Sequence, residues 1–258
     1  MFSWIRKKKV VIRCFTTIPA LPEMFPISRL SKVTPTWWRE TPAYGPEHVT
    51  DKDGKKRHSF QPAKMARTIK HCYALQKLWE RGICVPAWSE LTINTMQNGK
   101  SHGVSPTEKK SGSQHSPVQY PGMVSPEWIN WKAHSPWLIY TERYVQFYVT
   151  DAFYHNKSHN WMTMPGVIEF YHQHHSNVNM MFRAPAQGTM VKYDFPAGEM
   201  LCYLIPMFDE EYEIICETVS QSEYDKLEWA KKFSFRPAKF TRDQEIGGCP
   251  IHKGEIGL

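Results

Sequence analysis

Two histidines, His172 and His174, stand two residues apart in the stretch from Met164 to Phe182, which reads MPGVIEFYHQHHSNVNMMF. In a strand, every second side chain points to the same face, so both histidines would share a face with Phe170 and Val178. Their Cβ atoms would lie about 6.5 Å apart, and both imidazoles could bind one metal ion. The pattern indicates either a metal or ligand site within a β-sandwich or a polar patch at a strand end.

A divalent metal would need further ligands. His155 and His159, on either side of a predicted turn, are the nearest candidates along the chain. Glu169 would point to the opposite face and is a poor ligand. The alternative is a hairpin turn at His174-His175-Ser176, which we favour because one strand from 166 to 182 would exceed the usual length of about 3 to 10 residues.

The elements around these histidines read as a series of short strands separated by turn residues, which is typical of an antiparallel β-sandwich or a jelly-roll-like body. A first strand is predicted at 9–17, before a segment rich in proline. The later strands are predicted at 137–141, 144–154, 160–164, 166–182, 189–195, 200–208 and 212–219.

Two helices are predicted to accompany the strands. The first spans about 62–81, starts at Pro62 and ends at Gly82, and packs on the β body. Its expected buried positions are Met65, Ile69, Cys72, Leu75 and Trp79. The second spans about 221–233 and begins with a capping box formed by Ser220 and Glu223.

The first helix would carry a basic face made of Lys64, Arg67, Lys70 and Lys77. The chain has a formal net charge of +7, which suits a polyanionic partner. These four residues could bind nucleic acid, although basic helix faces in contact with solvent are more common. Nucleic-acid binding is therefore a third hypothesis for the function.

Residues 95–122 are rich in Asn, Gly, Ser, Lys, His and Pro and predict a long exposed loop. The apolar patterns on both sides look like parts of one core. We therefore expect one β-rich domain over residues 1–258, with an extended C-terminal tail at 237–258. A domain boundary within the loop is the alternative.

Several common sites have no signature in the sequence. It contains no GxxxxGK[ST], no GxGxxG between a strand and a helix, no GxSxG and no HExxH, and its six cysteines form no CxxC. Arg13 interrupts the only candidate signal peptide, and no apolar run approaches the ~20 residues of a membrane-spanning helix. We expect an intracellular protein without membrane association that is not an enzyme and has no cofactor.

Gly166-x5-His172-x-His174 resembles the start of the first cupin motif, and Pro196-x-Gly198 resembles part of the second. Cupins are double-stranded β-helix proteins that bind iron, manganese or zinc through three histidines and a glutamate. Here the expected glutamate is absent and Leu201 occupies the place of the last histidine. The resemblance implies the alternative hypothesis, a metal-dependent cupin-like enzyme that uses His172 and His174.

A second resemblance covers about residues 10–225. It is carried by Ser135-Pro136-Trp137-Leu138-Ile139, Met164-Pro165-Gly166-Val167-Ile168 and Phe195-Pro196-Ala197-Gly198-Glu199-Met200. These motifs are similar to those of an uncharacterised β-rich family encoded by tailed bacteriophages and some bacteria, with no known activity. The resemblance implies a viral or prophage origin and supplies no activity. We expect a protein of the host cytoplasm that can be incorporated in the virion.

We therefore predict a non-enzymatic binding or structural protein that acts through protein–protein surfaces. Its expected partners are other phage structural proteins or further copies of itself.

Overall fold

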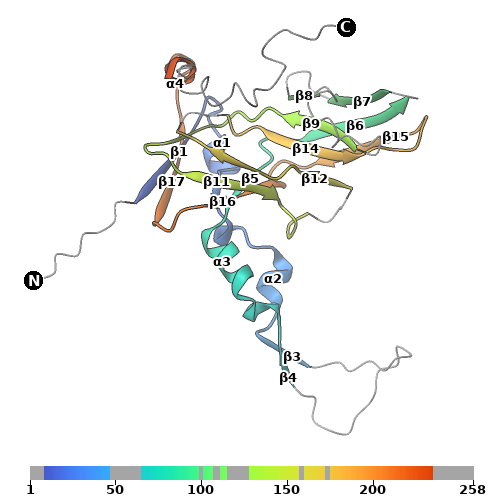
Figure 1. Cartoon of the computed structure of the whole chain (residues 1–258), viewed down its shortest axis with the longest axis vertical. Coiled ribbons are helices and arrows are strands. Elements are labelled where there is room, and N and C mark those ends of the chain that lie inside the picture. The colour runs from blue at the N-terminus through green and yellow to red at the C-terminus, as the bar shows by residue number, and fades with distance from the viewer. Residues whose placement is uncertain are drawn as a thin grey trace, which may run out of the picture.

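The computed structural model describes residues 9–46, 65–98, 101–106, 111–114, 128–156, 160–171 and 175–234. The protein is mainly β, with antiparallel sheets and a C-terminal helix, as the sequence predicts. Figure 1 shows the sheets gathered in one body, with a narrow arm that extends away from it.

Five strands form the largest sheet, in the order β13-β11-β16-β5-β2. Their bounds are Gly166–Glu169, Gln146–Asp151, Met200–Pro206, Ile83–Pro86 and Ser28–Arg29. A four-stranded sheet has the order β12-β14-β9-β8, with bounds Trp161–Thr163, Val178–Arg183, Trp128–Ala133 and Gly112–Gln114. The strand β9 follows the long low-complexity segment and was not predicted from the sequence.

Two three-stranded sheets complete the body. One has the order β10-β1-β17, with bounds Leu138–Thr141, Val10–Thr16 and Tyr212–Thr218. The other has the order β15-β6-β7, with bounds Met190–Phe195, Leu91–Asn98 and Ser101–Pro106. The helices are α1 (Leu21–Met24), α2 (Thr36–Glu40), α3 (Tyr73–Arg81) and α4 (Gln221–Ser234). The 3-10 turns are η1 (Leu30–Lys32) and η2 (Ile69–His71).

Alternating side chains from these sheets meet in one apolar core. On β14 the alternate residues Val178, Met180 and Phe182 are all buried, together with Trp131 of β9 and Phe147 of β11. Burying an apolar side chain of this size contributes about 1.5 to 3 kcal/mol relative to leaving it exposed. The period-two pattern of this strand thus places these three side chains on its core-facing side.

The first predicted strand is confirmed as β1. It pairs antiparallel with β10 on one side and parallel with β17 on the other. In the parallel ladder Cys14 lies directly opposite Cys216. Burial raises the pKa of Cys14, while a hydrogen bond from Cys14 lowers that of Cys216. The first and last strands of the body therefore lie side by side.

The stretch 166–182 is neither one strand nor a simple hairpin. β13 pairs with β11 in the five-stranded sheet, whereas β14 pairs with β12 and β9 in the four-stranded sheet. Between them His175 forms an isolated bridge with Leu138, and the Ser176 hydroxyl donates to Ser135 Oγ at 2.8 Å. The chain therefore crosses here from the five-stranded sheet to the four-stranded sheet, and the buried Phe170 lies just after β13.

The predicted helix at 62–81 is too long at its start. Residues 65–67 form β4, which pairs with β3 (Tyr44–Pro46), and α3 begins only at Tyr73. The Thr68 hydroxyl donates to the Pro42 and Ala43 carbonyls and also accepts from the amide of Lys70. These side-chain bonds to the backbone compete with helical hydrogen bonds. Residues 62–64 lie outside the described residues.

The helix α3 ends at Arg81, before Gly82, as predicted. Glycine is required at position 82 for a different reason than in an ordinary glycine cap. Gly82 has a φ of −69°, so it is not in the left-handed region. A Cβ at Gly82 would instead collide with Leu30 and with the Leu78 carbonyl. Glycine is needed here because η1 packs closely against the helix end.

The predicted exposed loop at 95–122 is wrong over part of its length. β6 continues to Asn98, β7 pairs with it, and β8 pairs with β9. Leu91, Ile93 and Thr95 alternate as buried residues, so the strand pattern extends into the polar segment. Residues 99–100, 107–110 and 115–127, and the predicted tail at 237–258, lie outside the described residues.

The C-terminal helix is confirmed as α4, and the Ser220 hydroxyl accepts from the amide of Glu223 as the capping box predicts. His175 contacts α4 through Glu228, with 3.1 Å between Nε2 and Oε1. The single domain over residues 1–258 stays a prediction.

Candidate functional site

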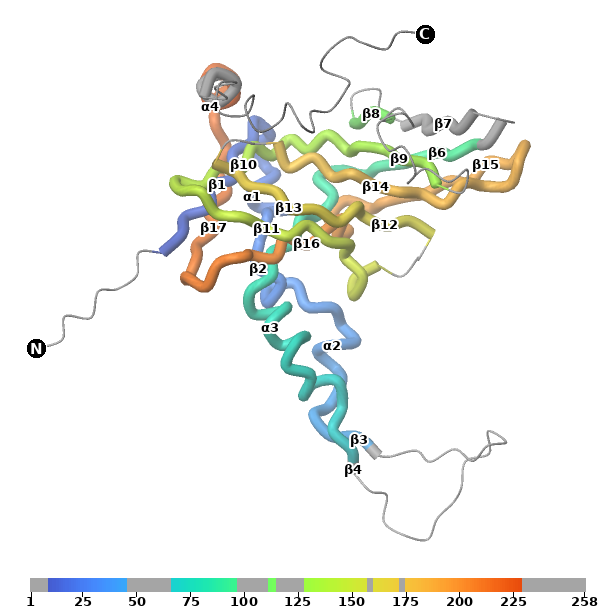
Figure 2. The backbone as a smooth tube through the Cα atoms, viewed as in Figure 1, coloured from blue at the N-terminus to red at the C-terminus, as the bar shows by residue number. Residues whose placement is uncertain are grey.

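The arm consists of α2, β3, β4, η2 and α3. Figure 2 shows these elements as a narrow extension of the chain outside the body of sheets. Four of the predicted site residues, His155, Arg67, Lys70 and Lys77, lie at its base or along it. The exposed aromatic side chains of the arm are a surface feature that the sequence did not reveal.

Of the four predicted metal ligands, the structure describes only His155; His159, His172 and His174 lie outside the described residues. His155 donates from Nε2 to the Val33 carbonyl at 2.6 Å, and its Nδ1 accepts from the Tyr203 hydroxyl at 2.5 Å. Both ring nitrogens therefore have protein partners. This arrangement gives His155 a structural role at the base of the arm.

Burial keeps both members of this pair uncharged. It lowers the pKa of His155, and the Val33 carbonyl acts in the opposite direction. Burial also raises the pKa of Tyr203 far above its ordinary value. A neutral imidazole with one fixed tautomer follows from the two bonds.

The metal hypothesis stays a prediction. Within the part of the chain that the structure describes, no group of three or more His, Cys, Asp or Glu side chains could hold a metal ion. His172 and His174, on which the hypothesis depends, are not among those residues.

An arm-base cluster of aromatic side chains joins the arm to the body. The rings of Trp38 and Trp79 lie 5.6 Å apart, and Trp79 lies 5.8 Å from the rings of both Tyr154 and His155. The neighbouring Trp37 donates from its indole to the Tyr154 carbonyl at 3.0 Å. Trp37 and Trp38 thus hold the arm to the body as a clamp.

Polar contacts strengthen the same junction. Arg81 donates to the Phe208 carbonyl at 2.6 Å, and the Tyr212 hydroxyl donates to the Arg81 carbonyl at 2.8 Å. The Arg29 guanidinium lies 3.9 Å from the centre of the Tyr212 ring and donates to the Tyr212 carbonyl. These contacts fix the direction in which the arm leaves the body.

The predicted basic face is not one helix face. Arg67 lies on β4, Lys70 on η2 and Lys77 on α3, while Lys64 lies outside the described residues. Lys77 pairs with Glu80 at 2.6 Å, and the Lys70 ammonium lies 4.6 Å from the centre of the Trp38 ring. Arg67 is the exposed member of the three that the structure describes, and the nucleic-acid-binding role stays a prediction.

The outer part of the arm exposes aromatic and basic side chains together, which we call the tip patch: Tyr44, Arg67, His71 and Tyr73. Tyr44 and Arg67 lie opposite each other across β3 and β4. The Tyr44 and His71 rings have centres 4.8 Å apart. Tyr44 is 49% exposed and Tyr73 71%. The basic residues Arg67, Lys70 and His71, followed by Tyr73, were the available sequence signal.

A second exposed surface lies on the outer face of the five-stranded sheet. Tyr203 and Cys84 of this face are covered by Leu75 and Trp79 of α3. Further along, Val167, Tyr148 and Ile205 form a row across β13, β11 and β16. The arm therefore covers one end of the face and leaves the other end open.

The open end of this face is apolar. We call it the outer strip and define it by Tyr144, Tyr148, Val167 and Met207. Tyr144, Val167 and Met207 are each 55% exposed and Tyr148 41%. Met207 is held beside β11 by its amide, which donates to the Gln146 carbonyl at 2.9 Å.

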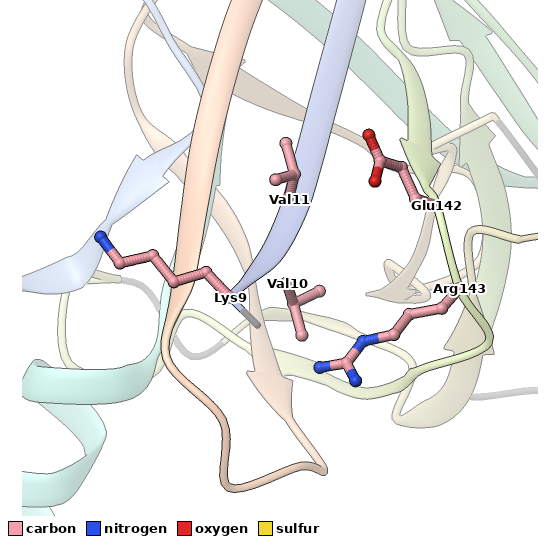
Figure 3. A pocket seen from close by; sticks show the side chains of 5 residues that line it. All are labelled: Lys9, Val10, Val11, Glu142 and Arg143. Atoms are coloured by element: carbon pink, nitrogen blue, oxygen red, sulfur yellow. The ribbon is translucent and has the colours of Figure 1, made fainter. Parts of the chain in front are cut away.

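A small hollow opens where β1 and the end of β10 diverge (Figure 3). Its volume is about 140 Å³, which is below the range of roughly 300 to 1,000 Å³ found for small-molecule sites. Glu142 and Arg143 extend toward β1, and Arg143 is already paired with Glu210 at 3.2 Å. The hollow is too small for a cofactor.

Comparison with protein-family models, with curated proteins and with solved structures gave no match. Among the described helices, none combines the length and the apolar character needed to cross a membrane.

Proposed function

We propose that this protein is a non-enzymatic binding or structural protein that acts through protein–protein surfaces. The outer strip is the observation that carries the proposal. It consists of four large side chains, each at least 41% exposed. Tyr148 and Val167 are paired across β11 and β13, Tyr144 precedes β11 and Met207 follows β16. Clustered apolar side chains on a protein surface are typical of a site that another protein covers.

The composition of the outer strip also suits an interface. Tyrosine and methionine are enriched at the centres of protein interfaces, whereas charged residues are depleted there. The strip holds two tyrosines, a methionine and a valine. Since β13 is an edge strand next to it, a partner could add backbone hydrogen bonds to this apolar contact.

A further copy of this chain is the partner that can be tested directly. Sedimentation velocity of the wild type should show association as its concentration rises from about 1 to about 100 µM, a range that reports weak to moderate interfaces. Val167→Lys should keep the protein monomeric over this range, because it introduces a charge into the apolar contact. Val191→Lys, on the edge strand β15, is the matched control and should associate like the wild type.

A wild type that stays monomeric, with Val167→Lys indistinguishable from it, would contradict self-association. The resemblance to proteins of tailed phages extends the proposal to a component of the virion. Mass spectrometry of gradient-purified particles tests that part, and particles without this chain would remove it.

A further inference from the structure

The tip patch has the chemical groups of a nucleic-acid site, which the proposed protein–protein function does not use. Its two tyrosine rings are held on different elements of the arm, one on β3 and one on α3. His71 lies between them in the chain and contacts Tyr44. Two exposed rings and a guanidinium are thus presented on a support that is fixed to the body.

The charge around the patch is positive. Arg67 and Lys70 accompany the two rings, and the Arg39 guanidinium of α2 donates to the hydroxyl of Thr36 on its own helix. Of the two acidic residues described within the arm, Glu80 is paired with Lys77, which leaves Glu40. This charge would attract a polyanion and would be screened by salt.

Exposed aromatic rings favour single-stranded nucleic acid over a duplex. An aromatic side chain stacks on the face of a base, and that face is accessible only where the base is unpaired. Reading a duplex would instead require a basic helix that enters the major groove. Lys77, the only lysine of α3, forms an ion pair with Glu80, so α3 is not such a basic helix.

We propose that the tip patch binds single-stranded nucleic acid, with Tyr44 and Tyr73 stacking on bases and Arg67 contacting a phosphate. The rings supply the part of the affinity that salt does not remove, and Arg67 supplies part of the salt-dependent attraction. This site does not depend on the outer strip, so Val167→Lys leaves it unchanged.

The test uses fluorescence anisotropy of the full chain with a labelled oligothymidylate of about 20 nucleotides, longer than the usual site of about 4 to 16. Tyr44→Ala and Tyr73→Ala should each weaken binding by about fivefold to a hundredfold, with little change in salt dependence. Tyr44→Phe and Tyr73→Phe keep the ring and should bind almost as the wild type does. Arg67→Gln should reduce the slope of log K against log salt by about 0.7.

Matched controls lie on the body. Tyr171→Ala removes an exposed ring from the body beyond the end of β13, and Lys192→Gln removes an exposed charge from β15. Neither should change the affinity by more than about twofold, since surface changes away from a site are close to neutral. Far-UV circular dichroism of each variant verifies that the strands are retained.

Two results would overturn the proposal. One is the absence of oligothymidylate binding by the folded wild type at low salt. The other is equal competition by polyglutamate together with unchanged binding by both tyrosine-to-alanine variants, which would assign the patch to acidic protein segments. Preferential competition by a duplex of the same length would likewise contradict the stacking role of the two tyrosines.

Discussion

At the scale of single residues, the hydrogen bonds of His155 explain why a histidine outside any catalytic motif lies at the base of the arm. Its two nitrogens join Val33, which precedes α2, to Tyr203 of β16. A neutral imidazole can donate from one nitrogen and accept at the other, so it satisfies a carbonyl and a hydroxyl at once. A residue that looks like a metal candidate in the sequence thereby connects two segments of the fold.

The pH dependence of stability should carry the signature of His155. Its pKa is lower in the folded protein than in the unfolded chain, so the unfolded chain binds more protons as the pH falls below the ordinary value of about 6.5. The contribution is present above that value and is lost as the pH falls toward the folded pKa. Urea unfolding between about pH 5 and 8 should therefore show that the free energy of unfolding falls toward acid pH, and that it falls less in His155→Gln than in the wild type.

The same substitution has a cost at neutral pH. Losing the imidazole leaves the Tyr203 hydroxyl and the Val33 carbonyl without this partner, which should reduce the free energy of unfolding by about 1 to 3 kcal/mol. Parallel acid limbs for the wild type and His155→Gln would show that other groups cause the decline. Tyr203→Phe serves as the companion variant, because it removes one bond and keeps the imidazole.

At the scale of elements, the arm depends on a few large side chains at its base. Trp79 is 4% exposed and contacts Trp38, Tyr154 and His155. The two strands of the arm, β3 and β4, form a sheet of their own that pairs with no strand of the body in the described residues. A two-stranded ribbon is marginally stable alone, so the arm relies on the arm-base cluster.

Trp79→Ala should therefore loosen the arm more than the body. Replacing a buried tryptophan by alanine usually costs about 3 to 5 kcal/mol. Limited trypsin digestion should cut the variant faster after Arg67 and Lys70, while the strands of the body resist. Trp79→Phe is the matched control, because it keeps one aromatic ring in the cluster, and the indole nitrogen that it removes has no hydrogen-bond partner in the described region. Equal digestion of wild type and Trp79→Ala would show that other contacts hold the arm.

How far the sequence predicts these elements depends on the reach of the interactions that form them. Strand alternation and the capping box at Ser220 are local, and they correctly identify β1, β14 to β17 and α4. The start of α3 is decided by bonds from Thr68 to Pro42 and Ala43, which local helical spacing does not reveal. β7 and β8 were missed because their sequences, SHGVSP and GSQ, show no apolar alternation, and β6 was missed because it runs into the same polar segment.

The candidate site was predicted less well, for the same reason. Arg67 was identified from its charge, but its neighbour Tyr44 lies 23 positions earlier and reaches it only through the pairing of β3 with β4. The outer strip requires three strands in register, and no local pattern identifies which of their apolar residues stay uncovered. Residue type alone suggests which side chains could belong to a binding surface. Strand pairing decides which of them lie next to one another.

At the scale of the whole molecule, one core connects all four sheets of the body. Its buried residues include Ile12 of β1, Ile129 of β9 and Phe195 of β15. Since side chains from distant parts of the chain pack against one another, loss of one sheet exposes the others. We expect the body to unfold in one cooperative transition, as the predicted single domain requires.

Ile12→Ala and Ile129→Ala test this cooperativity from two different sheets. Each should lower the free energy of unfolding by about 2 to 5 kcal/mol, because both side chains are 2% exposed and truncation leaves a cavity. Circular dichroism and tryptophan fluorescence should report the same midpoint for each variant. Separate midpoints by the two methods would instead divide the body into units that unfold independently.

The parallel pairing of β1 with β17 also governs the order in which the protein can be completed during its synthesis. The Arg13–Glu217 ion pair between these strands closes a separation of 204 residues. At a translation rate of about 5 to 20 residues per second, β1 is made roughly 10 to 40 seconds before its partner. β10 can pair with one edge of β1 in the meantime. The hydrogen-bonding groups on the other edge of β1 stay unpaired until β17 has been made. Contacts this distant slow folding, so the arrival of β17 is the step that ends the exposure of the first strand to wrong partners.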